Sequence, residues 1–237
     1  MNTVSESLWL ALSLITQADA ALWRIVGLSL RVSGTACLLG AVAGLALGTW
    51  LAASRFRGHA ALVWALNTLL ALPSVVVGLL VYLLLSRAGP LGALGILFTP
   101  TAMVIAQSLL VVPLIAALSR RLVLDALREG GDQLRSLGAS PLQAGALMLV
   151  HERFGVLTIV LTAFGRAIAE VGAVMIVGGN IDGVTRVMTT AIALETSKGD
   201  LALALALGIV LLGAVGVINL ALSAMQGRSA LAREALA

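Results

Sequence analysis

Apolar residues fall into five uninterrupted runs along the chain rather than into the alternating patterns of a soluble protein. The runs cover residues 32–53, 60–86, 99–119, 156–177 and 201–225. Each is long enough for a helix to cross the hydrocarbon core of a bilayer, which takes roughly 20 residues. Barrel strands are excluded, because they need alternating segments of about ten residues. The pattern predicts an all-α polytopic membrane protein with about five transmembrane helices.

Composition agrees with this class, because 60% of the residues are hydrophobic and only 11% are charged. The net charge of +4 does not indicate nucleic-acid binding, since the arginines are scattered. The positive-inside rule instead predicts an outer N-terminus and a cytoplasmic C-terminus, with nine arginines inside against five basic residues outside. The inner nine are Arg55, Arg57, Arg120, Arg121, Arg128, Arg135, Arg153, Arg228 and Arg233. The outer five are Arg24, Arg31, Arg87, Arg186 and Lys198.

The runs divide the chain into three parts. Residues 1–31 form an N-terminal lead-in, whose "LWLALSLI" is too short to span and is expected to lie amphipathically at the surface. The first long helix is expected to begin near Asp19 or Ala20. Residues 32–226 are expected to form the transmembrane domain, and residues 227–237 a cytoplasmic tail.

Two spans carry features that affect packing. Gly40, Gly44 and Gly48 repeat at four-residue spacing, which lets another helix backbone come close. Pro73 lacks a backbone N–H group and is expected to kink the second span. Such a kink lines a cavity in some membrane proteins and is purely architectural in others, so both interpretations stay open.

The most polar long stretch, at about residues 120–154, separates the third and fourth runs. Gly130–Gly131 is expected to interrupt any helix there. A short helix over 132–137 would then end at Gly138, the residue type favoured just past a helix terminus. Ser140 would cap a second helix that starts at Pro141. The sequence thus predicts a compact helical knob on the inner face.

The fourth run contains two ionisable residues, Arg166 and Glu170, four positions apart. Such residues within a span face protein or water. On one helix they would share a face and could form an ion pair, or they could serve as a pathway or gate. The segment that follows, residues 178–200, is polar and rich in threonine and could re-enter the membrane.

Enzyme chemistry is not expected in this chain. "HERFG" begins like a zinc-protease helix but has Gly155 where the second histidine must be. "GGNIDGVT" has the outline of a phosphate-binding loop, but Val184 replaces its essential lysine. The chain has one cysteine, so no disulfide within the chain and no thiolate metal cluster is possible. No cofactor and no metal site is expected.

The polar stretch resembles the inner loop of ABC importer permeases, whose pattern is Glu-Ala-Ala, three residues, Gly, nine residues, then Ile-x-Leu-Pro. Anchored on Gly138, Asp132 takes the position of the Glu. Gln133 and Leu134 replace the two Ala residues. Met148, Val150 and His151 stand where Ile, Leu and Pro would be, so the acid and the glycine are kept and the small pair and the proline are lost.

Longer blocks resemble the tungstate-type oxyanion permeases, near relatives of molybdate permeases. They are "LPSVVVGLLVYLLLSRAGPLG", "FTPTAMVIAQ", "FGRAIAEVGAVMIVGGNIDGVTR" and "MTTAIALETSKGDLALALALGIVLL". The resemblance implies a type I ABC importer permease fold in a bacterial or archaeal inner membrane, as a homodimer surrounded by lipid. It also implies a separate ATPase that binds ATP and Mg, an extracytoplasmic oxyanion-binding protein, and transport by alternating access.

The resemblance assigns ATPase coupling to the inner loop, and six of its residues are the predicted docking surface. They are Asp132, Arg135, Leu137, Gly138, Ala139 and Ser140. An oxyanion needs hydrogen-bond donors of moderate strength, because it must leave again. The candidate donors and gate residues are Ser74, Arg166, Glu170, Gly178, Gly179, Asn180, Thr189 and Thr190. Molybdate, sulfate or another anion is an alternative substrate, and an ion-coupled secondary carrier is an alternative mechanism.

Overall fold

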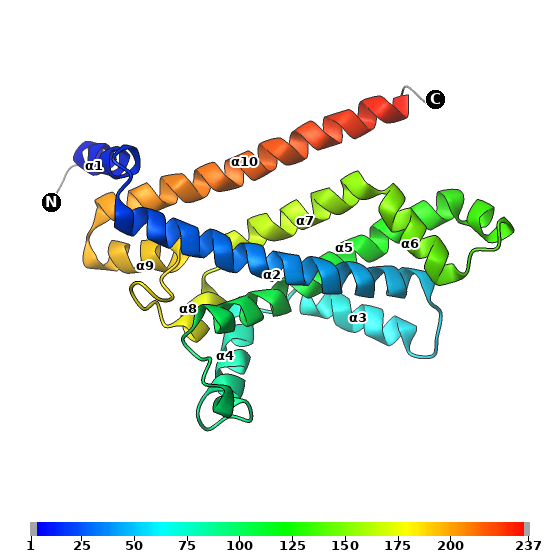
Figure 1. The fold of residues 1–237 in the computed structure, drawn as a ribbon, viewed down its shortest axis with the longest axis horizontal. Helices are drawn as coiled ribbons and strands as arrows, with labels where there is room; N and C mark the ends of the chain where they lie inside the picture. The colour runs from blue at the N-terminus through cyan, green and yellow to red at the C-terminus, as the bar shows by residue number, and fades with distance from the viewer. Residues whose placement is uncertain (1–3, 235–237) are drawn as a thin grey trace. The chain divides into compact units, whose positions relative to one another are not determined.

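The computed structural model describes residues 4–234 and the side chains of residues 5–224. Within that range the secondary structure is helical, and no strand is found. The helices are, in chain order, α1 (Val4–Thr16), α2 (Ala20–Ala53), α3 (His59–Leu69), α4 (Ser74–Leu85), the 3-10 helix η1 (Gly92–Leu94), α5 (Pro100–Ser136), α6 (Pro141–His151), α7 (Arg153–Ile168), α8 (Gly172–Gly178), α9 (Met188–Lys198) and α10 (Leu201–Glu234) (Figure 1). The predicted all-α fold is confirmed.

Three helices in the described part of the chain are long and apolar enough to cross a membrane. They are α2, α5 and the stretch Leu201–Ala224 of α10. Two pairs of shorter helices, α3 with α4 and α6 with α7, each pass the same test when taken together, which brings the number of spans to as many as five. The break between α3 and α4 lies at residues 70–73, where Pro73 predicts a kink.

Two helices extend beyond the apolar runs that predicted them: α2 begins before residue 32, and α10 continues past residue 225. Helix α2 starts at Ala20, where Asp19 Oδ1 accepts a 2.9 Å hydrogen bond from the backbone N–H of Leu22. The helix then continues through residue 31, so the boundary drawn there falls within α2. Helix α10 likewise extends to Glu234, and the side chains of Arg228 and Arg233 lie outside the described residues.

The expected interruption at Gly130–Gly131 is wrong, because α5 runs unbroken from Pro100 to Ser136. A helical glycine costs only about 1 kcal/mol relative to alanine. Here Gly130 leaves the space that the Met148 side chain occupies, since a Cβ at Gly130 would lie 2.8 Å from Met148 Cε. Packing between α5 and α6 therefore outweighs the local preference.

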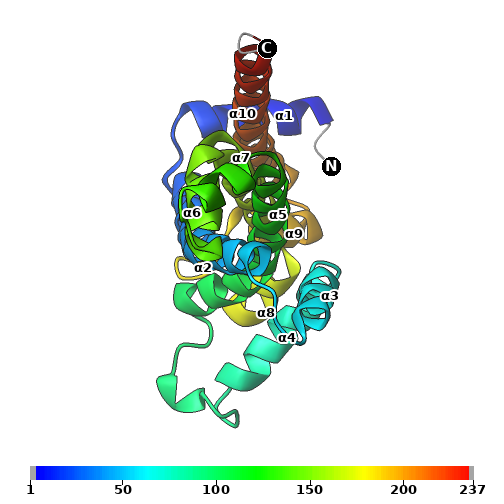
Figure 2. The same cartoon turned by 90° about the vertical axis from the view of Figure 1, so that its right-hand side faces the viewer.

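The described fold divides into two compact units. The first comprises Met1–Ala36, Pro73–Gln107 and Gly165–Ile218, and the second comprises Cys37–Leu72, Ser108–Phe164 and Asn219–Ala237. In the first unit, α4 packs along α8 (Figures 1 and 2), and a Cβ at Gly78 would lie 2.8 Å from Ala173 Cα. Only glycine permits so close an approach of two backbones.

In the second unit, the predicted glycine stripe on α2 meets α5. A Cβ at Gly40 would lie 2.6 Å from Val111 Cγ1, and one at Gly44 would lie 2.8 Å from Ile115 Cβ. A Cβ at Gly48 would fall 2.5 Å from the carbonyl oxygen of Ala116. The close-packing interpretation of the stripe is therefore confirmed.

Candidate functional site

The polar stretch at residues 120–154 contains a helical hairpin, formed by the end of α5 and by α6, whose turn is fixed by backbone hydrogen bonds. At the end of α5, the N–H of Gly138 donates to the carbonyl of Arg135 at 2.9 Å, and that of Ala139 donates to the carbonyl of Leu134 at 3.0 Å. This pair of bonds is a Schellman motif. The motif requires a left-handed backbone conformation at the first residue past the helix end. Gly138 supplies it with φ of +88°. The prediction that a helix ends at Gly138 is confirmed, although that helix is α5 rather than a separate short one.

The second arm of the hairpin begins as the sequence predicts. Ser140 caps α6, and its Oγ accepts a 3.4 Å hydrogen bond from the N–H of Gln143. In return, Gln143 Oε1 accepts a 2.9 Å bond from the N–H of Ser140, which completes a capping box. Pro141 occupies the first turn, where its missing N–H group is not needed.

The turn of this hairpin presents an apolar side chain to solvent. Leu137 is 83% exposed, although it stands between two ordered helices. Beside it, Asp132 and Arg135 form an ion pair of 3.2 Å that is itself largely exposed. An ordered, exposed leucine flanked by charges is suited to contact another protein, because hydrophobic groups with polar rims are typical of interaction sites.

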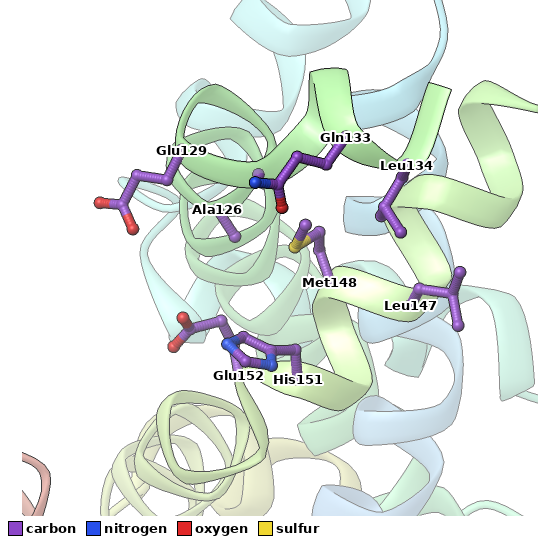
Figure 3. A pocket seen from close by; sticks show the side chains of 9 residues that line it. Ala126, Glu129, Gln133, Leu134, Leu147, Met148, His151 and Glu152 are labelled. Carbon is purple, nitrogen blue, oxygen red and sulfur yellow. The ribbon is translucent and has the colours of Figure 1, made fainter. Parts of the chain in front are cut away.

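Four of the positions at which this loop departs from the ABC permease pattern line one cavity of about 450 Å³ between α5 and α6 (Figure 3), whereas Val150 is exposed and lies outside it. Gln133 and Leu134 line it from α5, and Met148 and His151 line it from α6. Figure 3 shows the Gln133 side chain pointing toward Met148. Gln133 and Leu134, which replace the two alanines of the pattern, therefore lie beside this cavity. Gly130 leaves room for the Met148 side chain on the same cavity wall.

The fourth span is interrupted where the sequence predicted a continuous helix. Helix α7 ends at Ile168 and α8 begins at Gly172. Of the two alternatives for Arg166 and Glu170, the ion pair is not found, because Glu170 lies in the break and no ion pair joins the two among the described side chains. Glu170 Oε1 instead accepts a 3.3 Å hydrogen bond from the N–H of Ala173 and so caps α8. Arg166 remains exposed at the end of α7.

Side chains from distant parts of the first unit satisfy the carbonyl groups at this break. Gln107 is 3% exposed, and its Nε2 donates to the carbonyl oxygen of Ala167 at 2.9 Å. Thr189 is 7% exposed, and its Oγ1 donates to the carbonyl oxygen of Glu170 at 2.8 Å. These bonds satisfy carbonyl groups at the break, which would be costly to leave unpaired in an apolar environment.

The other predicted anion donors already have partners. The N–H of Gly179 donates to the carbonyl of Met175 at 3.0 Å, and the carbonyl of Gly178 accepts from Thr185 Oγ1. Thr190 Oγ1 donates to the carbonyl of Val187 at 3.1 Å. Asn180 Nδ2 donates to the carbonyl of Thr190 at 3.3 Å. These contacts stabilise the segment between α8 and α9 in this conformation.

Ser74 follows the break at Pro73, in the first turn of α4. A Cβ placed on Gly172 would lie 2.9 Å from Ser74 Oγ, so the hydroxyl sits directly against the start of α8. Of the predicted path residues, Ser74, Glu170 and Thr189 therefore lie around the start of α8, and all three belong to the first unit.

Two buried amides in this region each carry an oxygen without a partner. The Oε1 atom of Gln107 and the Oδ1 atom of Asn180 are buried and accept no hydrogen bond. Asn180 is among the predicted donors, whereas sequence reasoning missed Gln107. A glutamine inside an apolar run, as in "FTPTAMVIAQ", is the signal that points to it. Buried polar oxygens in proteins usually accept a hydrogen bond, so these two atoms are exceptions within the described side chains.

Arg186, in the segment between α8 and α9, is a further basic residue that could attract anions. Its Nη1, however, lies 3.5 Å from an Asp182 oxygen and 3.9 Å from a Glu195 oxygen. Lys198 Nζ also lies 3.1 Å from Glu195, which is only 6% exposed. Arg24 Nη2 also lies 3.8 Å from Asp182, so Arg186 is paired within the chain, but three basic residues share two carboxylates.

Long apolar helices, a break with satisfied carbonyls in the fourth apolar run and an ordered polar hairpin are the features of a multi-pass membrane protein. A comparison with family models gave no match. The chain is 42% identical over 226 residues to the tungstate uptake system permease protein TupB of Peptoclostridium acidaminophilum, covering 95% of this chain and 99% of that one. It is 39% identical to a probable anion ABC transporter permease protein of Haloferax volcanii, covering 82% and 86%.

More distant similarity extends to the molybdenum transport system permease protein ModB of Escherichia coli, at 30% identity over 75% of this chain and 82% of that one. The chain belongs to the family of ABC importer permease subunits, in its tungstate type.

Proposed function

We propose that this chain is the membrane-spanning permease subunit of an ATP-driven importer for tungstate. It works as a homodimer with a separate ATPase, which holds ATP and Mg, and with an extracytoplasmic binding protein that delivers the anion. The observation that carries the proposal is the similarity along nearly the whole chain to a tungstate uptake permease. Its N-terminus is outside the cell and its C-terminus is cytoplasmic.

The hairpin at the end of α5 is the coupling element. A chain without a nucleotide site of its own must receive its driving force by contact with the ATPase. The surface formed by Asp132, Arg135, Leu137 and the turn 138–140 docks there, with Leu137 as the apolar anchor, because it is 83% exposed on an ordered turn. Closure of the ATPase dimer then moves the hairpins and opens the spans alternately to the two sides.

The break between α7 and α8 is the gate of the anion path. Arg166 is exposed in the last turn of α7, and no ion pair to it exists among the described side chains. A charge at this depth must face water or protein, so it lines the path and attracts the anion. Ser74, Asn180, Thr189, Thr190 and the glycines 178–179 shape the wall beside it.

The test is ATPase activity of this chain reconstituted with its ATPase in proteoliposomes, with and without tungstate-loaded binding protein. We expect stimulation only by the loaded binding protein. Leu137→Asp should abolish both stimulation and co-purification of the ATPase. The matched control is Leu94→Asp, because Leu94 is also exposed, at 60%, but lies in η1.

Stimulation that persists in Leu137→Asp would overturn the docking assignment. Stimulation by molybdate or sulfate at least as strong as by tungstate would overturn the choice of substrate. These two anions are included because some relatives are named as sulfate or molybdenum transport permeases.

A further inference from the structure

Three arginines gather where the apolar part of α5 ends. Arg120 directly follows the apolar run, and its Nε atom is buried without a hydrogen-bond partner. The charges of Arg55 and Arg121 lie close enough to act on it. Among the described side chains, none of the three forms an ion pair with a carboxylate. Like charges are thus held together without a counter-ion from this part of the chain.

Helix packing in the second unit holds them in place. Because Gly48 has no side chain, α2 lies directly against α5, and a Cβ there would be 3.0 Å from the backbone nitrogen of Arg120. Helix α2 ends at Ala53, so the loop that follows brings Arg55 to the same place. His59 fixes this loop, since its Nε2 lies 2.8 Å from the carbonyl oxygen of Leu51.

The arginines line cavities rather than a flat surface. One cavity of about 410 Å³ is lined by Arg120, Arg121 and Arg128, together with Leu124 and Asp125. The single carboxylate in it is already paired, because Asp125 lies 3.0 Å from Arg128. A second cavity of about 320 Å³ has Arg55 on its wall and shares Leu124 and Arg128 with the first.

Such a site needs an anion, and its chemistry indicates which kind. Guanidinium groups bind phosphate-type oxygens through several N–H donors in a planar fork. Arg120 and Arg121 also directly follow an apolar stretch long enough to cross a bilayer, so we expect them near the lipid headgroups. Basic pockets between helices bind anionic phospholipids at that level.

We propose that Arg55, Arg120 and Arg121 form a binding site for a phosphate-type anion. The anion is the phosphodiester of an anionic lipid or a free tetrahedral oxyanion in the adjoining solution. Leu124 contributes an apolar wall, which the acyl chains of a bound lipid would also contact. This proposal does not depend on which anion the permease transports.

The test compares the full chain with its Arg120→Gln/Arg121→Gln variant by native mass spectrometry and thermal unfolding. In the lipid arm, the protein is placed in nanodiscs of phosphatidylcholine with or without phosphatidylglycerol. In the free-anion arm, it is kept in detergent and titrated with inorganic phosphate. Removing two arginines near an anionic headgroup should weaken binding about thirtyfold. Arg87→Gln is the control, because Arg87 is exposed in the loop before η1.

Phosphatidylglycerol that is retained by the parent chain and by Arg87→Gln, but lost from the double variant, would identify a lipid site. A rise in unfolding temperature with inorganic phosphate, lost in the same variant, would identify a free oxyanion. If the double variant does not fold, Arg55→Gln repeats the test from the loop after α2. Retention of both ligands by every variant, or binding of neither by the parent, would overturn the proposal.

Discussion

Thr189 Oγ1 donates a hydrogen bond of 2.8 Å to the backbone carbonyl oxygen of Glu170. The bond joins the first turn of α9 to the break between α7 and α8. The carbonyl of Glu170 belongs to the residue whose side chain caps α8. The Thr189 hydroxyl therefore pairs with a backbone carbonyl group in the non-helical residues that interrupt the fourth apolar run.

We expect Thr189→Val to destabilise the permease by about 1–3 kcal/mol, because it leaves a buried carbonyl without its donor while keeping the shape of the side chain. Thermal unfolding of the purified chain in detergent measures this change. Thr189→Ser keeps the hydroxyl and should retain most of the stability. Equal unfolding temperatures for the valine and serine variants would show that the bond contributes nothing.

Gly48→Ala should destabilise the second unit by about 1–3 kcal/mol, because the added methyl group would press on the Ala116 carbonyl and on Ser119 Oγ. The control is Gly216→Ala in α10, where nothing lies within 4 Å of an added Cβ. That change should be neutral or stabilising, since alanine favours helix. The same unfolding temperature for both variants would contradict the packing of α2 on α5.

The two glycines at positions 131 and 138 should respond in opposite directions to alanine. Gly131 lies inside α5 and an added Cβ would meet only ordinary contacts, so Gly131→Ala should stabilise α5 by about 1 kcal/mol. Gly138 has φ of +88°, and Gly138→Ala should cost about 1–2 kcal/mol. Hydrogen exchange of the amides in the last turns of α5 reads out the first change, and that of the amides of residues 138 and 139 reads out the second. A Gly138→Ala variant that is as well protected as the parent would refute the Schellman turn.

Arg166→Gln should lower tungstate uptake roughly tenfold to a hundredfold, as expected when a charged hydrogen-bond donor is lost from an anion path. The fold should be preserved, because no described side chain forms an ion pair with Arg166. Uptake into proteoliposomes, with Arg166→Lys as the charge-conserving comparison, checks the prediction. Unchanged uptake together with a lower unfolding temperature would instead mark Arg166 as structural.

Orientation can be tested by labelling single cysteines with a membrane-impermeant maleimide in intact cells. The native Cys37 is only 4% exposed and is replaced by alanine in the background. Arg87→Cys should be labelled in intact cells and Arg57→Cys only after permeabilisation. The reverse result would place the N-terminus inside.

The elements that sequence predicted best are those determined by nearby residues. The break before α4 follows from Pro73, and the start of α6 follows from Ser140 with Pro141. Both depend on chemistry within one helical turn. The long apolar helices were also visible, because their hydrophobicity is a property of each segment.

The features that sequence missed depend on residues far apart in the chain. At the break at residues 169–171, the side chains of Gln107 and Thr189 donate hydrogen bonds to backbone carbonyl groups. The break contains no proline that could have predicted it. The continuity of α5 through Gly130 depends on Met148 across the hairpin. The partners of Thr190 and Asn180 could not be predicted either, because a polar residue in a span shows only that some partner is needed.

Helix α5 has a mechanical consequence. Its 37 residues give a rod of roughly 55 Å, well beyond the thickness of a hydrocarbon core. Pro113 removes one backbone bond within it and is its natural point of flexure. A tilt of about 10° there would carry Ser136 roughly 6 Å, given the rise of 1.5 Å per residue. The part of α5 beyond Pro113 is in effect a lever arm, which converts a displacement of several ångströms at the hairpin into a small rotation at the proline.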